Sequence, residues 1–179
     1  MVGKTEDGSA APAVSPPWGE TIDIRDLFLK QKEVTRKRTR TIYPCIPRDK
    51  VAWVPVEGAL SLGQLLRHVW HSESGVREVP LYDRWGYYER RIPEGLFPIL
   101  GDVTDIGHEI EMLETTHQKT LDLVAQMPAE RLEREFINEK FSFRRKGYAI
   151  LLGIIEHEVH HRAQLLTYLR ILGTPWPGH

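Results

Sequence analysis

The chain has 179 residues, a length that suits one domain with a core large enough to fold without disulfides. Its single cysteine, Cys45, excludes an intramolecular disulfide, and the 24 basic and 25 acidic residues create no general field that would attract nucleic acid or an anionic membrane. No apolar run reaches the roughly 18 residues of a membrane span, so we expect a soluble protein of the reducing cytoplasm.

The N-terminus mixes charged residues with the run GSAAPAVSPP and lacks the apolar segment of a signal peptide. We therefore predict a flexible tail over residues 1–20 and one domain over residues 21–179. Apolar side chains at helical spacing predict a first helix over about residues 23–43. Its basic run RKRTR, Arg36–Arg40, is typical of a solvated helix face. The alternative, a phosphate site, lacks an accompanying glycine or aromatic pattern.

Prolines interrupt the next segment, YPCIPRDKVAWVPVEGA, which we predict to be a connector. Ser61 and Gln64 match a capping box, which predicts a second helix from Leu62 to about Ser74. Residues 75–101 follow neither a helical nor a strand period, and we predict a long ordered loop there. The aromatic side chains of this loop either cap the core or cover a functional site; they are Tyr82, Trp85, Tyr87 and Tyr88.

A third helix is predicted from about residues 102–105 to Pro128, which ends it. The connector that follows contains three phenylalanines able to pair as a short extended ribbon, namely Phe136, Phe141 and Phe143. The last helix is predicted from Gly147 to Leu172, before a Gly173 and Pro175 stop. Four helices without a long strand pattern predict an all-α four-helix bundle, in which any site lies between helices.

Two histidines of the last helix form a candidate metal-binding pair. His157 and His161 are four residues apart, so their rings project about 40° from each other on consecutive turns. Apolar residues share their arc, which indicates that the pair faces the bundle interior. Buried imidazoles need partners, and a divalent metal is a common one. His160 lies off this arc, and we expect it to flank or support the two ligands.

The string HEVHH also matches the zincin signature, in which Glu158 would act as general base. A protease of that kind needs a third ligand downstream, and the residues after His161 contain no carboxylate and have Thr167 where a third histidine would stand. The third ligand should therefore come from another helix. His68 borders the apolar stripe of the second helix and is the best candidate; the alternatives are His71, His108 and His117.

The segments LGQLLRHVWHSE and HEVHHRAQLLTYLRILG resemble the DinB/YfiT-like superfamily of metalloenzymes, and the resemblance extends over about residues 23–177. By position, it implies that His68, His157 and His161 are metal ligands. It also implies a four-helix bundle, zinc or nickel as the metal, and a homodimer. Members include thiol S-transferases, a thiol-dependent isomerase and proposed hydrolases, so the resemblance implies no single reaction. It gives no reason to expect DNA binding.

Three neutral imidazoles leave positions on a metal open for a thiolate or a water molecule. We therefore expect a metal-dependent transferase that uses a low-molecular-weight thiol, or a hydrolase, acting on a small molecule. The alternative is a non-catalytic dimeric module stabilised by metal. Residues expected near the ligands or the substrate are Gln164, His160, Glu158, Arg144 and Arg145. The two arginines would either hold substrate carboxylates or face solvent.

Overall fold

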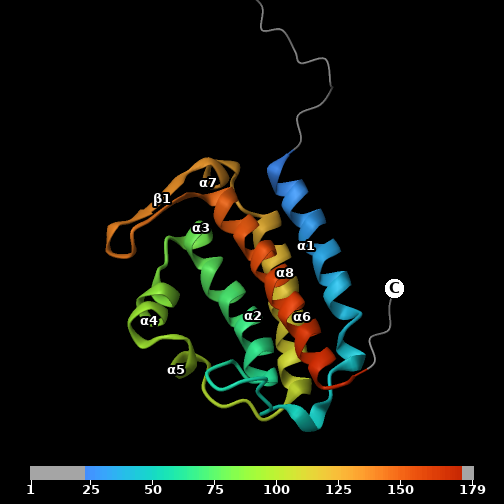
Figure 1. Cartoon of the computed structure of the whole chain (residues 1–179). Coiled ribbons are helices and arrows are strands. Elements are labelled where there is room, and N and C mark those ends of the chain that lie inside the picture. Colours follow the sequence, from blue (N-terminus) through green and yellow to red (C-terminus); the bar gives the residue numbers. More distant parts are fainter. Residues whose placement is uncertain (1–22, 175–179) are drawn as a thin grey trace, which may run out of the picture.

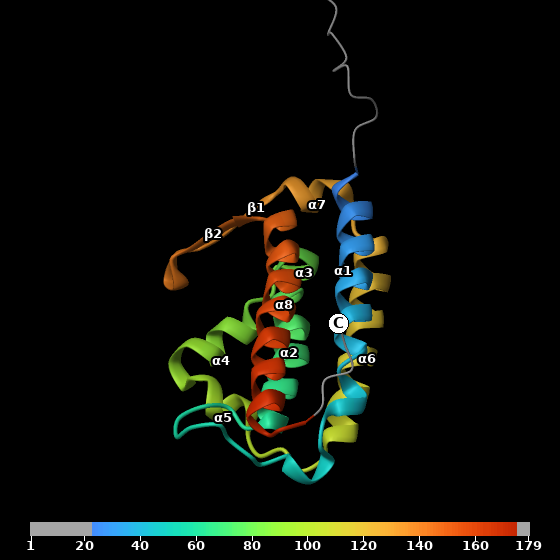
Figure 2. The same ribbon diagram turned by 45° about the vertical axis from the view of Figure 1, so that its right-hand side comes forward.

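A computed structural model of the chain describes residues 23–174, and the tail predicted over residues 1–20 lies outside them. Within that range the structure is a helical bundle, which confirms the predicted fold class. Four long helices lie side by side, as Figures 1 and 2 show from two directions. They are α1 (Ile24–Arg40), α2 (Leu62–Val76), α6 (Ile106–Ala125) and α8 (Gly147–Ile171).

The ends of these helices follow local capping chemistry. Ser61 Oγ accepts a hydrogen bond of 3.1 Å from the backbone N–H of Gln64, and Gln64 Oε1 accepts one of 3.1 Å from the N–H of Ser61, so the predicted capping box is confirmed. Asp23 caps α1 and Asp105 caps α6 in a similar way. The connector after α1 contains two short 3₁₀ turns, η1 (Tyr43–Cys45) and η2 (Arg48–Lys50).

The predicted long loop between the second and third helices is wrong in its secondary structure. The segment folds into α3 (Glu78–Tyr82), α4 (Gly86–Glu94) and α5 (Leu96–Leu100). Each helix is short, and each ends at a residue with positive φ: Asp83, Gly95 and Gly101. Such short helices cannot show the long apolar period that identifies a helix in a sequence. Figures 1 and 2 show α4 and α5 beside α2.

The chain between α6 and α8 forms α7 (Ala129–Glu133) and a two-stranded antiparallel hairpin, β1 (Glu135–Asn138) and β2 (Phe143–Lys146). The predicted ribbon is therefore present. Phe136 in β1 is buried and Phe143 in β2 packs on Trp85, whereas Phe141 lies in the 3₁₀ turn η3 (Glu139–Phe141) between the strands. The hairpin projects on the same side of the bundle as α4 (Figure 2).

Charged side chains are buried where α1, α2 and α8 meet. Lys32 and Arg36 of α1 are 0% exposed, and both donate hydrogen bonds to Glu73 of α2 and Glu158 of α8. The interpretation of the basic run Arg36–Arg40 as a solvated helix face is thus wrong at Arg36 and at the buried Thr39. Two carboxylates from distant parts of the chain compensate the charges, which is what allows their burial. Among residues 23–174, no helix is long and apolar enough to span a membrane.

Candidate metal centre

Three imidazoles converge between α2 and α8. His157 Nε2 lies 3.1 Å from His68 Nε2 and 3.0 Å from His161 Nε2. All three can direct one ring nitrogen into a space less than 4.8 Å across. Two nitrogens that bind one zinc ion at about 2.0–2.1 Å lie roughly 3.0–3.5 Å apart, so these spacings suit a shared metal ion. The structure thus brings together the three histidines selected from the sequence.

The hydrogen bonds of the outer ring nitrogens fit metal binding. His68 Nδ1 is 3.0 Å from Ser72 Oγ, and His161 Nδ1 is 2.6 Å from Gln164 Oε1. An amide oxygen only accepts, so Nδ1 of His161 carries the proton and its Nε2 presents a lone pair. A metal ion among the three Nε2 atoms would accept this lone pair together with those of neutral His68 and His157. The donor set therefore fits a divalent metal of borderline softness, such as zinc or nickel.

Burial keeps the three imidazoles neutral. It lowers the pKa of His68 and of His157 to about 3, and the neighbouring histidines add to both shifts. Burial also lowers the pKa of His161, against the opposing effect of the hydrogen bond to Gln164. Neutral imidazole is the form that binds metal, so the three histidines can bind an ion without first losing a proton.

Ser72 and Tyr87 form a hydrogen-bonded chain that ends at the ring of His68. Neither contact was predicted from the sequence. Ser72 Oγ lies 2.8 Å from the hydroxyl of Tyr87 and 3.0 Å from His68 Nδ1, which links α4 to the metal centre through α2. Tyr87 packs against Gly75, where a Cβ atom would clash with its ring. Side chains four residues apart on a helix are neighbours, so the contact between His68 and Ser72 could have been predicted from their spacing. No pattern in the sequence near Ser72 indicates the contact with Tyr87.

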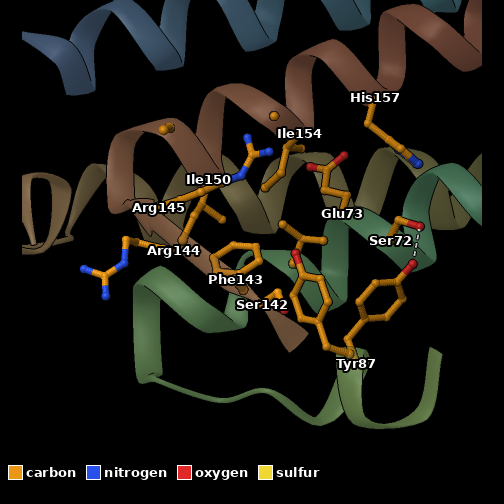
Figure 3. A pocket seen from close by; sticks show the side chains of 14 residues that line it. Ser72, Glu73, Tyr87, Ser142, Phe143, Arg144, Arg145, Ile150, Ile154 and His157 are labelled. Carbon is orange, nitrogen blue, oxygen red and sulfur yellow. Dashed lines mark hydrogen bonds between the residues drawn. The ribbon is translucent and has the colours of Figure 1, made fainter. Parts of the chain in front are cut away.

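A cavity of about 430 Å³ opens beside the centre, between α2, α4, α8 and the β hairpin. Figure 3 shows His157 and Ser72 at one end of it and Arg144 and Arg145 at the other. Its walls combine Tyr87, Tyr88 and Phe143 with aliphatic side chains of α2 and α8, namely Val76, Ile150 and Ile154. The aromatic residues of α4 thus do more than cap the core, because two of them line this cavity.

The two arginines at the cavity differ in their partners. Arg144 donates a hydrogen bond of 2.9 Å to Glu135, and Figure 3 shows its guanidinium directed away from the cavity. Arg145 has no ion pair or hydrogen bond to a side chain within residues 23–174, and its guanidinium lies near Ile154 in the same view. Arg145 is therefore the arginine free to bind a ligand.

Glu158, which was expected near the ligands or the substrate, is directed toward α1. It is 1% exposed and faces α1, where it accepts hydrogen bonds of 2.7 Å from Lys32 Nζ and 2.7 Å from Thr39 Oγ1. Although burial raises the pKa of Glu158, the charges of Lys32 and Arg36 outweigh that effect and lower it to about 2. A carboxylate so strongly bound to cations is a poor general base.

The other histidines within residues 23–174 lie outside the three-histidine cluster. His160 is exposed, and its ring packs edge to face against that of His161, with the ring centroids 4.9 Å apart. His71 packs on Trp70 and Tyr87, on the far side of Tyr87 from the cavity. His108 of α6 is exposed, whereas His117 of the same helix is 1% exposed and bonds to Glu33.

The comparisons with known proteins agree with this architecture. A sequence model of the DinB superfamily matches residues 31–165. The chain is 26% identical over 149 residues to the uncharacterized protein YjoA of Bacillus subtilis strain 168, which covers 82% of this chain and 86% of YjoA. The crystal structure of YjoA, described as DinB-like, matches with a TM-score of 0.59 at 24% identity and covers 87% of this chain and 96% of that one, which shows a common fold. Because the family model matches most of its length, the chain belongs to the DinB superfamily.

Proposed function

We propose that this protein is a metal-dependent enzyme that acts on a small molecule, with a low-molecular-weight thiol as co-substrate. The observation that carries the proposal is the position of His157, which is both part of the three-histidine cluster and part of the cavity wall. A cavity of about 430 Å³ has the size of a small-molecule site. A purely structural metal would need no such access.

Each part of the site has a role in this proposal. A bound zinc or nickel ion would supply a Lewis acid that favours deprotonation of a thiol or a water molecule. His68, His157 and His161 hold the ion, and Ser72 and Gln164 orient two of the rings. The aliphatic and aromatic walls exclude water from the bound substrate, which strengthens polar contacts there.

Two other functions use the same residues. A hydrolase would bind water in place of the thiol, and a non-catalytic dimeric module would bind only a ligand. The thiol reaction is preferred because the aromatic and aliphatic walls of the cavity suit a soft, partly apolar substrate. A homodimer and a cytoplasmic location, where thiols stay reduced, belong to this proposal.

The test is a conjugation screen of the zinc-loaded and nickel-loaded protein. Low-molecular-weight thiols such as cysteine and glutathione are offered with a chromogenic aryl halide, and a nitrophenyl ester is assayed in parallel. We expect conjugation that His157→Ala abolishes and that Glu156→Ala, an exposed neighbour, leaves intact. Ester hydrolysis without conjugation would favour the hydrolase, and activity that survives His157→Ala would contradict both.

A further inference from the structure

Glu73 of α2 has one carboxylate oxygen without a partner at the wall of the cavity. The residue is 2% exposed, and its Oε2 accepts hydrogen bonds of 2.8 Å from Lys32 and 3.3 Å from Arg36. Its Oε1 is buried and has no hydrogen-bond partner among residues 23–174. Glu73, Ile154 and His157 line the same cavity, and Figure 3 draws the carboxylate between the other two side chains.

A buried carboxylate oxygen that lacks a donor is unfavourable. Leaving such a group unpaired costs more than a net hydrogen bond contributes, so buried polar atoms in folded proteins are nearly always paired. Lys32 and Arg36 already share Oε2, and both approach from α1. Arg77, one turn along α2, donates its hydrogen bonds to Thr116 and Thr120 of α6 and makes none to Glu73. The cavity that Glu73 borders is the space from which a ligand can supply the missing donor.

The surrounding charges indicate which kind of donor fits. Three buried cations lie around two buried carboxylates: Lys32, Arg36 and Arg77 around Glu73 and Glu158. These five buried groups carry one excess positive charge, which the more exposed Glu114, 3.8 Å from Arg36, offsets in part, and the three histidines beside them fit a divalent cation. An ammonium group would add to that repulsion, whereas a neutral N–H or O–H would not.

Arg145 supplies a second contact in the same cavity. Its guanidinium is exposed and has no side-chain partner among the described residues, and a guanidinium binds a carboxylate through two parallel hydrogen bonds. Between Glu73 and Arg145 the walls are largely apolar, formed in part by Val76, Ile150 and Ile154. A ligand that satisfies both residues has a carboxylate at one end and a neutral donor at the other.

We infer that Glu73 and Arg145 recognise a small carboxylate: Arg145 binds its carboxylate group, and Oε1 of Glu73 accepts a hydrogen bond from an amide N–H or a hydroxyl of the same molecule. The identification of this ligand as a substrate rests on the proposed function. The binding itself does not, because neither contact requires a thiol or a metal.

The test uses probes without a thiol. N-acetylglycine, N-acetyl-β-alanine and N-acetyl-γ-aminobutyrate carry the same N–H and carboxylate at increasing separation, and each has an N-methyl counterpart that lacks the donor. Binding to the metal-loaded protein is measured by calorimetry. We expect at least one N–H probe to bind about tenfold or more tightly than its N-methyl counterpart, which is the effect of one hydrogen bond to a charged group. Equal affinities at every separation, or no binding at all, would overturn the inference.

Variants then assign the contacts. In Glu73→Gln the amide oxygen is still required by Lys32 and Arg36, so the NH₂ group takes the place of Oε1 and the preference for N–H probes should disappear. Arg145→Ala should weaken all probes, whereas Arg144→Ala, whose side chain pairs with Glu135, should not.

A crystal structure of the wild-type protein with the tightest probe makes the assignment independent of how well the variant folds. The amide nitrogen should lie within hydrogen-bond distance of Glu73 Oε1. A preference that persists in Glu73→Gln, or a probe bound elsewhere, would refute the role of Glu73. If the probes bind as expected but the conjugation screen fails, only the proposed function is lost.

Discussion

Replacing Glu158 by glutamine tests whether this residue stabilises the fold and takes no part in the chemistry. The variant keeps the shape of the side chain and removes one of the two carboxylates that balance Lys32 and Arg36. Removing one partner from a buried ion pair costs about 3–5 kcal/mol, since it leaves a charge uncompensated. For a chain of this size that corresponds to a fall in melting temperature of about 6–20 °C.

The assay is urea unfolding of both proteins after metal removal, so that metal binding does not contribute to the difference. Glu156→Gln is the matched control, since Glu156 is exposed on the same helix and should change the free energy of unfolding by no more than about 0.5 kcal/mol. Folded Glu158→Gln protein should still bind metal with nearly wild-type affinity. A variant of wild-type stability that has lost metal binding or activity would refute this reasoning and restore Glu158 to the site.

Three further outcomes follow from the same contacts. His68→Ala should weaken metal binding by more than about 100-fold in competition with a chelator, while His71→Ala changes it little; the reverse order would move the site to the other face of α2. Ser72→Ala and Gln164→Leu should each lower metal affinity by about 10 to 100-fold without unfolding the protein, and a variant that gains only thermal stability would show that its polar group does not support the metal. Light scattering at micromolar concentration should give the mass of a dimer, and a strictly monomeric mass would remove that part of the proposal.

Local signals account for much of the fold. Ser61, Gln64 and the apolar stripe that follows them specify the start of α2, and prolines and glycines mark several of the other ends. The four-residue spacing of His157 and His161 likewise places two rings together within one helix. Features that depend on a single helix or turn were therefore predictable.

The buried charges were not predictable, because their partners are far apart in sequence. Arg36 and Glu158 are 122 residues apart, and a basic run next to polar residues has the composition of a solvated face. Tyr87 contacts Ser72 because α4 packs against α2. The nine residues of α4 are too few to show a clear helical period of apolar residues in the sequence. Contacts of this kind depend on the tertiary arrangement and leave no local pattern.

The metal content of the purified protein tests the central claim most directly. After expression in metal-replete medium and dialysis, elemental analysis should find about one zinc or nickel ion per chain, as expected for three imidazole ligands at one centre. His157→Ala, folded by circular dichroism, should contain almost none. A wild-type protein without bound metal, or a His157→Ala variant that retains a full equivalent, would contradict the assignment of this centre.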